Sequence, residues 1–417
     1  MSKPLKILVV TQYFWPENMR INNMVDGFIA KGHEVTVLTG VPNYPEGQVF
    51  SDYRENPEQF SSYGGARIIR VPMLARGRRS ITLVLNYFSF FSSASVVGAY
   101  KLRGEEFDSI FVYAVSPIMS AIPALVIGRL KKAPVFIWVL DLWPETLSAV
   151  GVVKSKTLLS LVGRLVSWIY NRADYLLLQS QAFEGSVKKY CTRSISKDRI
   201  VYFPSWAEDD FSGKDDSSSD LLERDDSLFT IVFAGNLGEA QDFPAILEAA
   251  QAIRHELPVR WVIVGDGRVS DWLGKRVTEL GLTNVLLLGR HPLAKMPALF
   301  SAADALLVSL KTNEVFEKTI PGKVQAYLAS GKPVIAMIDG EAARVVTESG
   351  AGMACGSGDA HGLTQIVRSM FQLAPEERQQ IGKAGRQFYL EHFSKVKLFD
   401  RLEELFRRGS LRRNSKE

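Results

Sequence analysis

The segment spanning residues 314–333 holds the residue types that a sugar diphosphate would need for binding. Pro321 can occupy the first turn of a helix that Gly331 would end. Glu317 stands just before that helix, where its carboxylate can accept hydrogen bonds from sugar hydroxyls. Lys323 stands in the first turn, where it would face phosphate together with the positive end of the helix dipole. A capped surface helix with a solvated lysine fits the same residues, so both interpretations stay open.

A second pair of acids follows a short apolar run at residues 135–139. This run predicts a buried parallel strand, and open parallel sheets bind ligands at the carboxyl ends of their strands. Asp141 could act as a base on an attacking hydroxyl or bond a sugar hydroxyl, and Glu145, at the same strand end, is a second catalytic candidate. Because aspartate is also a favoured helix N-cap, Asp141 could instead cap the helix that would begin at residue 142.

The familiar cofactor and metal motifs are missing. No Gly-x-Gly-x-x-Gly follows the first predicted strand, and no Gly-x4-Gly-Lys-Ser/Thr occurs, which argues against a dehydrogenase and a P-loop NTPase. There is no His-x-x-x-His and no Asp-x-Asp after a predicted strand. Cys191 and Cys355 are too few for a disulfide framework or a zinc cluster. We therefore expect no metal and no bound cofactor.

The elements that must position these residues alternate short β-branched runs with helical stretches. This alternation predicts parallel, doubly wound sheets. One sheet with so many strands would be unusually wide, so we predict two Rossmann-like domains. The predicted strands are residues 6–11, 34–39, 67–71, 109–113, 135–139, 175–179, 229–234, 260–264, 285–288, 305–308 and 334–337.

Charge and composition indicate where the domains end. Residues 1–200 carry a net charge of +9, residues 201–226 carry −7, and the remainder carries +3. A basic first half can attract nucleic acid or an anionic membrane, and charge alone does not choose between them. We predict a first domain over residues 1–204, an acidic linker over 205–227, a second domain over 228–385, and a C-terminal helix with a basic tail over 386–417 that returns to the first domain.

The motifs of this chain resemble those of glycosyltransferase family 4. Residues 314–335 resemble its signature, in which two acids separated by seven residues precede Ala/Ser-x-Gly-x-Pro-Val. Further resemblances follow in the order of the family, at residues 32–37, 233–238, 263–267, 288–290 and 299–304. The resemblance spans residues 6–390. It implies the GT-B fold, with two Rossmann-like domains facing a cleft, and a metal-independent sugar transfer.

Two motifs resemble the branch of this family that builds bacterial surface polysaccharides. Residues 12–17 read Gln-Tyr-Phe-Trp-Pro-Glu, and residues 138–145 read Trp-Val-Leu-Asp-Leu-Trp-Pro-Glu. They are most similar to the N-acetyl-L-fucosamine transferases of O-antigen and capsule assembly. This resemblance implies a UDP-sugar donor carrying a (deoxy)amino sugar, and a glycan acceptor on polyprenyl diphosphate. It implies no nucleic-acid partner.

The resemblance also assigns a donor site. It would contain Gly235 and Glu317, with Arg290 on uracil or phosphate. The family usually carries Arg and Lys where Asn236 and Gln241 stand, so Lys323 and the helix N-terminus would supply the phosphate-binding charge.

Two positions depart from the pattern of the family. Counting back from Gly331, its second acid falls on Ala326, whereas Gln325 keeps the seven-residue gap from Glu317 and would contact the ribose. On the acceptor side the resemblance places Glu17, with Asn22 and Asn23 standing in place of the usual glycine pair.

Two other functions fit the same residues. A non-hydrolysing UDP-sugar epimerase would use a similar fold without an acceptor lipid. A catalytically weak, membrane-bound scaffold would be consistent with alanine at the second acid position. Incubation with UDP-sugars distinguishes these functions. Epimerisation without acceptor supports the epimerase, sugar transfer supports the glycosyltransferase, and no turnover supports the scaffold.

Residues 80–100 carry no charge, and thirteen of these 21 residues are apolar or aromatic. Length alone would allow a membrane span. Because Thr82, Asn86, Ser89 and Ser93 recur at helical spacing, we predict an interfacial helix instead, with a helix buried on the sheet as the alternative. The first apolar run, residues 7–10, is too short for a signal peptide, which predicts a cytoplasmic protein. The interfacial helix would make it peripheral on the inner membrane. The predicted membrane contacts are aromatic residues and basic flanks: Phe88, Phe90, Phe91, Arg76, Arg78, Arg79, Lys101 and Arg103.

Overall fold

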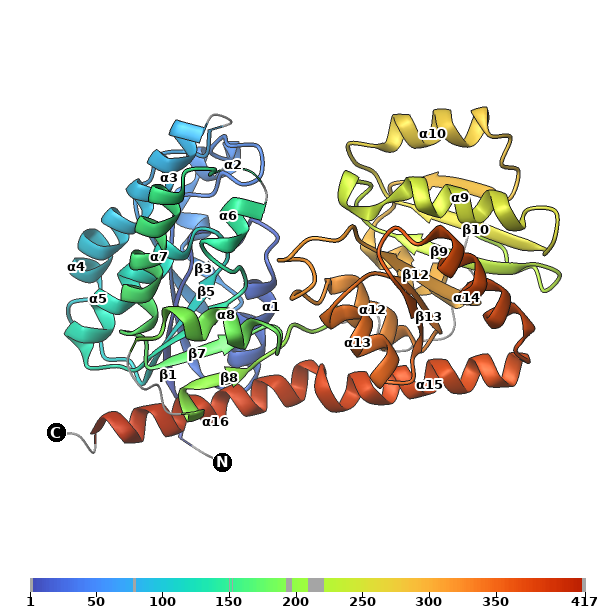
Figure 1. The fold of residues 1–417 in the computed structure, drawn as a ribbon. Helices are drawn as coiled ribbons and strands as arrows, with labels where there is room; N and C mark the ends of the chain where they lie inside the picture. Colours follow the sequence, from blue (N-terminus) through green and yellow to red (C-terminus); the bar gives the residue numbers. More distant parts are fainter. Residues whose placement is uncertain are drawn as a thin grey trace. The chain divides into compact units, whose positions relative to one another are not determined.

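The computed structural model describes residues 3–77, 80–149, 151, 153–192, 197–208 and 221–414. The chain divides into two compact units (Figure 1). Unit 1 comprises residues 1–179, 183–203 and 398–417, and unit 2 comprises residues 180–182 and 204–397. Each unit is built on one β-sheet with helices on both faces. The predicted α/β class with two parallel sheets is thus confirmed.

Sheet A of unit 1 has eight strands in the order β3-β4-β2-β1-β5-β6-β7-β8. Its neighbouring strands run parallel, except that β3 is antiparallel to β4. The strands are β1 (Lys6–Val10), β2 (Glu34–Thr39), β3 (Ser62–Tyr63), β4 (Ala66–Arg70), β5 (Ser109–Ala114), β6 (Val135–Val139), β7 (Tyr175–Leu178) and β8 (Ile200–Tyr202). Their carboxyl ends meet at one edge of the sheet, where a parallel sheet places ligands.

The helices of unit 1 cover both faces of sheet A. They are α1 (Arg20–Ala30), α2 (Ser51–Glu55), α3 (Ser80–Ser93), α4 (Ala99–Lys101), α5 (Ile122–Lys131), α6 (Glu145–Ala149), α7 (Lys156–Tyr170), α8 (Phe183–Tyr190) and the C-terminal α16 (Lys395–Asn414). A π-helical segment, Ala94–Gly98, joins α3 to α4. Side chains of α3, α5 and α7 pack together on one face of the sheet.

The C-terminal helix packs on the other face, beside α1 (Figure 1). The Phe28 ring of α1 lies 5.8 Å from that of Phe399 and 5.6 Å from that of Phe406, centroid to centroid. Phe406 also contacts Phe111 and Phe136 on β5 and β6. These aromatic contacts make the last helix part of the core of unit 1.

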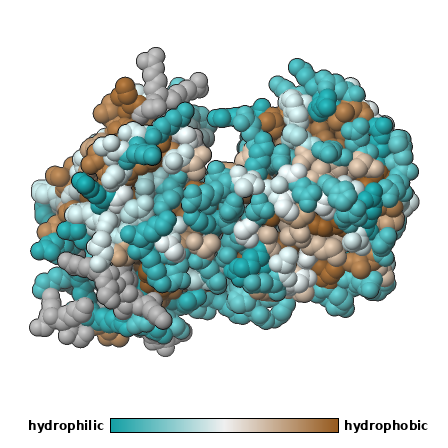
Figure 2. Space-filling model, viewed as in Figure 1, coloured by the Kyte–Doolittle hydropathy of each residue, from teal (hydrophilic) through white to brown (hydrophobic). Residues whose placement is uncertain are grey.

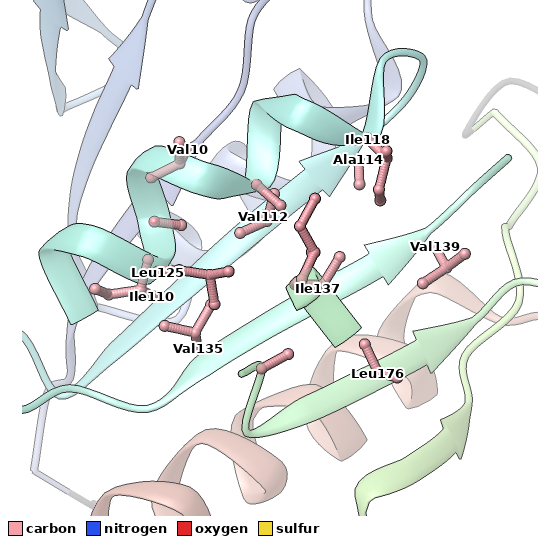
Figure 3. Packing of buried hydrophobic residues seen from close by; sticks show 14 of the residues in the cluster. Val10, Ile110, Val112, Ala114, Ile118, Leu125, Val135, Ile137, Val139 and Leu176 are labelled. Carbon is pink, nitrogen blue, oxygen red and sulfur yellow. The ribbon is translucent and has the colours of Figure 1, made fainter. Parts of the chain in front are cut away.

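The core on the α3, α5 and α7 face is continuous with the middle strands (Figure 3). Ile110 and Val112 of β5, with Ile137 and Val139 of β6, are completely buried. Helices cover both faces of these strands, so every side chain must be apolar, which explains why the strands appear as uninterrupted apolar runs in the sequence.

Sheet B of unit 2 has six parallel strands in the order β11-β10-β9-β12-β13-β14. They are β9 (Phe229–Ala234), β10 (Val259–Val264), β11 (Val285–Gly289), β12 (Ala305–Ser309), β13 (Val334–Met337) and β14 (Gly352–Cys355). The helices are α9 (Phe243–Ile253), α10 (Ser270–Glu279), α11 (Met296–Ser301), α12 (Gly322–Ser330), α13 (Glu341–Glu348), α14 (Ala360–Gln372) and α15 (Pro375–His392).

The acidic segment differs in part from the predicted linker. Trp206, Ala207 and Leu222 are at most 4% exposed, and Ala207 and Leu222 pack in the core of unit 2. The flanks of the predicted linker therefore belong to that unit, because their apolar side chains are buried there. Residues 209–220 lie outside the described residues.

Candidate functional site

The first turn of α12 lies against the end of β9. Gly235, which follows β9, has a φ of +134°, and a Cβ atom there would lie 2.5 Å from Cε of Lys323. The Nζ atom of Lys323 lies 3.6 Å from the centroid of the Phe233 ring. Glycine is needed at position 235 because a side chain would displace the lysine and because L-residues avoid this φ.

The ammonium group of Lys323 is the positive charge of this site, and no acidic partner of it lies among the described residues. Burial lowers its pKa to about 7. Within the described part of unit 2, no carboxylate forms an ion pair with Lys323, and its Nζ atom contacts the face of the Phe233 ring. A half-buried ammonium group that lacks a counter-ion is suited to bind an anion.

Charged side chains follow the other strands of sheet B at the same edge. Asp266 follows β10 and accepts hydrogen bonds from the hydroxyl of Ser270, at 2.7 Å, and the amide of Gly267. These bonds lower the pKa of Asp266. Arg290 is exposed just beyond β11, and its charge acts on Asp266. The predicted Arg290 therefore lies at the ligand-bearing edge.

Glu317 is held by its backbone against the turn after β13. Its carbonyl oxygen accepts the amide N–H of Glu341 at 2.6 Å. A Cβ atom on Gly340, whose φ is +72°, would lie 2.0 Å from that same oxygen. The Glu317 side chain is half-buried, and none of the described residues hydrogen-bonds its carboxylate. The predicted sugar-binding carboxylate is thus available to a ligand.

The other predicted donor residues differ in accessibility. Asn236 is exposed in the loop after β9. Gln241 holds that loop, since its Oε1 atom accepts the amide N–H of Gly238 at 2.9 Å. Gln325 is 1% exposed, and its Oε1 atom has no partner among the described residues. The predicted ribose contact of Gln325 is not supported, because α12 turns this side chain into the protein.

An acid at this edge was not predicted from the sequence. Glu341 opens α13 and is 7% exposed, and its two carboxylate oxygens accept hydrogen bonds from Arg344 at 2.7 and 2.9 Å. Asp339, two residues earlier, accepts bonds from Thr312 and Ser357. Burial raises the pKa of Asp339, but these hydrogen bonds outweigh it and lower the pKa. The signal in the sequence was Asp-Gly-Glu directly after a parallel strand.

At the carboxyl edge of sheet A, Asp141 is tied to β5 through Ser116. Its Oδ2 atom accepts the backbone N–H of Ser116 at 2.9 Å and the hydroxyl at 2.7 Å. The indole N–H of Trp143 donates to the Ser116 hydroxyl at 2.9 Å. The side chain of Asp141 therefore bridges two strand ends, and no helix-capping bond from it is recorded among the described residues. It is half-buried, and its Oδ1 atom has no recorded partner there.

Glu145 lies apart from this arrangement. Its Oε1 atom accepts the phenol O–H of Tyr190 at 3.3 Å, and its Oε2 atom is buried without a hydrogen-bond partner among the described residues. Its charge also acts on the buried Tyr170. The structure gives no support to the predicted catalytic role of Glu145, because α6 turns the glutamate toward α7 and α8.

Glu17 organises loops at this edge. It is 3% exposed, and its carboxylate accepts the backbone N–H groups of Phe14, Asn43 and Tyr44 at 2.7–3.0 Å. Burial raises the pKa of Glu17, and these three hydrogen bonds oppose the increase. Asn22 donates to the Glu17 carbonyl at 2.8 Å, and Asn23 is half-buried on α1. Neither oxygen of Glu17 is free for an acceptor.

Three of the four polar residues predicted to form a stripe on α3 lie toward the protein, and Thr82 is exposed. Asn86 is completely buried, and Ser89 and Ser93 are half-buried. The exposed large apolar side chains of this region are Ile81, Val84, Leu85, Phe88, Val96 and Tyr100, between 48% and 76% exposed. Figure 2 shows brown, hydrophobic residues along the side of unit 1 where Figure 1 places α3 and α4.

This orientation corrects part of the predicted membrane contact. Phe90 is completely buried in the core, because it lies on the inward side of α3 with Asn86. Phe88 is exposed, and its ring lies 4.9 Å from that of the half-buried Phe91. Lys101 and Arg103 are exposed. Arg78 and Arg79 lie outside the described residues.

By length and composition, the helix over Ile81–Lys101 could cross a membrane, and 22% of its apolar window is buried. Among the described residues, no group of three or more His, Cys, Asp or Glu side chains could hold a metal ion.

Two protein-family models match the chain. The model described as "Glycosyl transferase 4-like domain" matches residues 18–206, and the model described as "Glycosyl transferases group 1" matches residues 229–372. The chain is a group 1 glycosyltransferase of family 4. The resemblance found in the sequence is therefore confirmed at the level of the family.

Solved structures share the architecture of this glycosyltransferase. HepE from Anabaena in complex with UDP aligns with a TM-score of 0.69 at 16% identity, covering 96% of this chain and 99% of HepE. A glycosyltransferase from Rickettsia africae aligns with a TM-score of 0.69 at 15% identity, covering 98% of this chain and 99% of that one. The predicted GT-B fold is confirmed.

A relative by sequence is WcaI of Escherichia coli (strain K12), which is named as a colanic acid biosynthesis glycosyl transferase. It is 26% identical to this chain over 346 residues, which cover 78% of this chain and 82% of WcaI.

Proposed function

We propose that this glycosyltransferase moves a sugar from a UDP-sugar to a glycan carried on polyprenyl diphosphate, in the synthesis of a bacterial surface polysaccharide. The observation that carries the proposal is Lys323, which lies at the first turn of α12 beside Gly235 and has no acidic partner among the described residues. Complexes of HepE with UDP and with UDP-glucose support a UDP-linked donor. The name of WcaI supports a role in polysaccharide synthesis.

In the proposed reaction, the bond between the sugar C1 atom and the β-phosphate oxygen breaks. Negative charge develops on the departing diphosphate, where Lys323 and the N-terminus of α12 would stabilise it. The acceptor hydroxyl forms the new bond to C1 and releases a proton. Asp141, held by Ser116, would take that proton. Glu317 would orient the donor sugar through its hydroxyls.

A panel of UDP-sugars tests this proposal. A bound donor raises the unfolding temperature by mass action, so UDP and the cognate UDP-sugar should stabilise the protein. UDP-N-acetyl-L-fucosamine is the donor we expect to stabilise it most, with UDP-glucose as the comparison. Absence of any binding by UDP would overturn the donor assignment. Epimerisation of a UDP-sugar without acceptor would identify an epimerase instead, and turnover of none of them would support a scaffold.

We further propose that the exposed apolar side of α3 and α4 docks on the cytoplasmic face of the inner membrane. A helix lying at a membrane surface buries apolar side chains in the headgroup boundary and places basic groups on anionic lipids. The exposed side chains of Ile81, Val84 and Phe88 supply the apolar groups. Lys101 and Arg103, at the end of the same helical region, supply the basic groups.

Vesicle flotation tests the docking. The protein should float with vesicles that contain phosphatidylglycerol, and binding should weaken with salt. The double variant Val84→Asp/Phe88→Asp should stay at the bottom of the gradient. Leu411→Asp is the matched control, since Leu411 is 70% exposed on α16 and should not change flotation. A wild-type protein that does not float would contradict the docking.

A further inference from the structure

We propose that Arg76, together with Tyr13, Tyr44 and Tyr87, binds the diphosphate group of the lipid-linked acceptor. This inference rests on the proposed function and adds a binding site to it. Tyr13, Tyr44 and Arg76 follow the carboxyl ends of β1, β2 and β4 of sheet A, the edge that also carries Asp141, and Tyr87 lies on α3. Arg76 would then contact the substrate instead of the membrane surface.

The backbone at Arg76 is fixed by a neighbouring loop. Its amide N–H donates to Oδ1 of Asn43 at 2.8 Å. Gly47, with a φ of +78°, passes so close that a Cβ atom there would lie 2.0 Å from the carbonyl oxygen of Arg76. Asn43 is itself held by the Glu17 carboxylate through a 2.8 Å bond. The guanidinium group therefore extends from a rigid base.

The guanidinium group lies among tyrosine rings. Its Cζ atom is 5.3 Å from the centroid of the Tyr44 ring, and the Tyr13 and Tyr44 rings are 5.1 Å apart. The positive charge of Arg76 acts on the Tyr13 side chain. Burial raises the pKa of Tyr13 and of Tyr87, and the positive charge of Arg76 opposes the increase at both. The phenol groups of Tyr13 and Tyr87 therefore stay neutral at physiological pH.

No acid neutralises Arg76 within the described part of the chain. A guanidinium group has five N–H donors in a planar arrangement that matches phosphate oxygens, and few of these donors are used here. A half-buried arginine with rings on its sides and no carboxylate is a suitable site for a phosphate or diphosphate.

The inner side of α3 connects this site to the apolar surface. Oδ1 of Asn86 accepts bonds from Gln12, at 2.7 Å, and from the Tyr13 hydroxyl, at 3.3 Å. Its Nδ2 group donates to the carbonyl of Leu74 at 2.5 Å, two residues before Arg76. The outer side of the same helix exposes Val84 and Phe88. A diphosphate at Arg76 would therefore have its hydrocarbon chain beside an apolar helix face.

The position of Asp141 agrees with this arrangement. Its charge, like that of Arg76, acts on Tyr87. Tyr13 follows β1, and Ser116, which holds Asp141, follows the neighbouring strand β5, so both groups lie at one edge of sheet A. A glycan attached to a diphosphate at Arg76 would extend toward Asp141, where its hydroxyl would react.

Binding of farnesyl diphosphate, a soluble probe with the same head group, tests the site. Arg76→Ala should weaken its binding about ten- to a hundredfold, as expected for the loss of a charge-assisted contact. Arg76→Lys, which keeps the charge and a long side chain, should lose less. Arg164→Ala is the matched control, since Arg164 is exposed on α7 of the same unit. Unchanged thermal unfolding would show that the variants fold.

Comparison ligands identify the source of the phosphate. Farnesyl phosphate and inorganic pyrophosphate should bind more weakly than farnesyl diphosphate, and UDP should bind wild type and Arg76→Ala equally. If Arg76→Ala weakened UDP instead, the site would serve the donor and the inference would be wrong. If only phosphatidylglycerol vesicles responded to the variant, Arg76 would be a headgroup contact. Failure of the wild type to bind farnesyl diphosphate would also overturn the inference, whereas failure to bind UDP would overturn the proposed function.

Discussion

The Nζ atom of Lys323 lies 3.6 Å from the centre of the Phe233 ring, and the pKa of this lysine is lowered to about 7 by burial. Below pH 7 the ammonium form is already present for an anion. Above pH 7, binding of a diphosphate must take up a proton, because the bound anion favours the charged lysine. The affinity for UDP should therefore fall by up to about tenfold for each pH unit above 7.

Titration calorimetry from pH 6 to 9 measures this linkage. The Lys323→Met variant lacks the titrating amine, so its pH profile shows the effect of the titration of UDP alone and serves as the reference. The linkage to stability has the opposite sign. Between about pH 7 and pH 10.5 the unfolded chain holds the lysine proton more tightly than the ligand-free fold does, so raising the pH stabilises the fold. Parallel pH profiles in wild type and variant would contradict the assignment.

A second prediction concerns Gly235. Its replacement by alanine places a methyl group 2.5 Å from Cε of Lys323 and should lower the affinity for UDP about ten- to a hundredfold. Gly281→Ala is the matched control. Gly281 also has a positive φ, of +59°, but nothing lies within 4 Å of the added Cβ, so it carries the backbone strain without the contact. Equal loss of UDP affinity in both variants would show that strain alone is responsible.

Most of the fold could be predicted from the sequence. All eleven predicted strands are present within one residue at each end, because strands of a sheet covered by helices are rich in β-branched and other apolar residues. The missed strands lack that signal. β3 has two residues, β8 has three at the sheet edge, and β14 consists of Gly352, Met353, Ala354 and Cys355.

The candidate site was harder to predict than the strands. The sequence places Asp141 and Glu145 together after β6, but the backbone turns one toward Ser116 and the other toward Tyr190. Likewise, Phe90 of α3 was expected at a membrane surface, yet it is completely buried in the core of unit 1. Helical spacing identifies which residues share a face. It does not identify the partner of that face, which depends on contacts distant in the sequence.

The third prediction tests the packing of the C-terminal helix. Phe406 is completely buried against Phe28, Phe111 and Phe136. Phe406→Ala should lower the free energy of unfolding of unit 1 by about 3–5 kcal/mol, since it leaves a cavity among aromatic rings. Leu411→Ala, at a 70% exposed position of the same helix, should change it by no more than about 0.5 kcal/mol. Urea unfolding measures both, and equal effects would contradict the packing described.

The fourth prediction separates Asp141 from Glu145. Asp141→Asn keeps the shape of the side chain and removes its ability to take a proton, so kcat should fall about 100- to 10,000-fold while the affinity for UDP stays unchanged. Ser116→Ala removes the 2.7 Å bond that orients Asp141 and should lower kcat by a smaller factor. Glu145→Gln should leave kcat close to the wild-type value, because its carboxylate contacts Tyr190 instead. Kinetics with the cognate donor and acceptor measure all three variants. A Glu145→Gln variant as inactive as Asp141→Asn would reverse the assignment, and an active Asp141→Asn variant would show that another group accepts the proton.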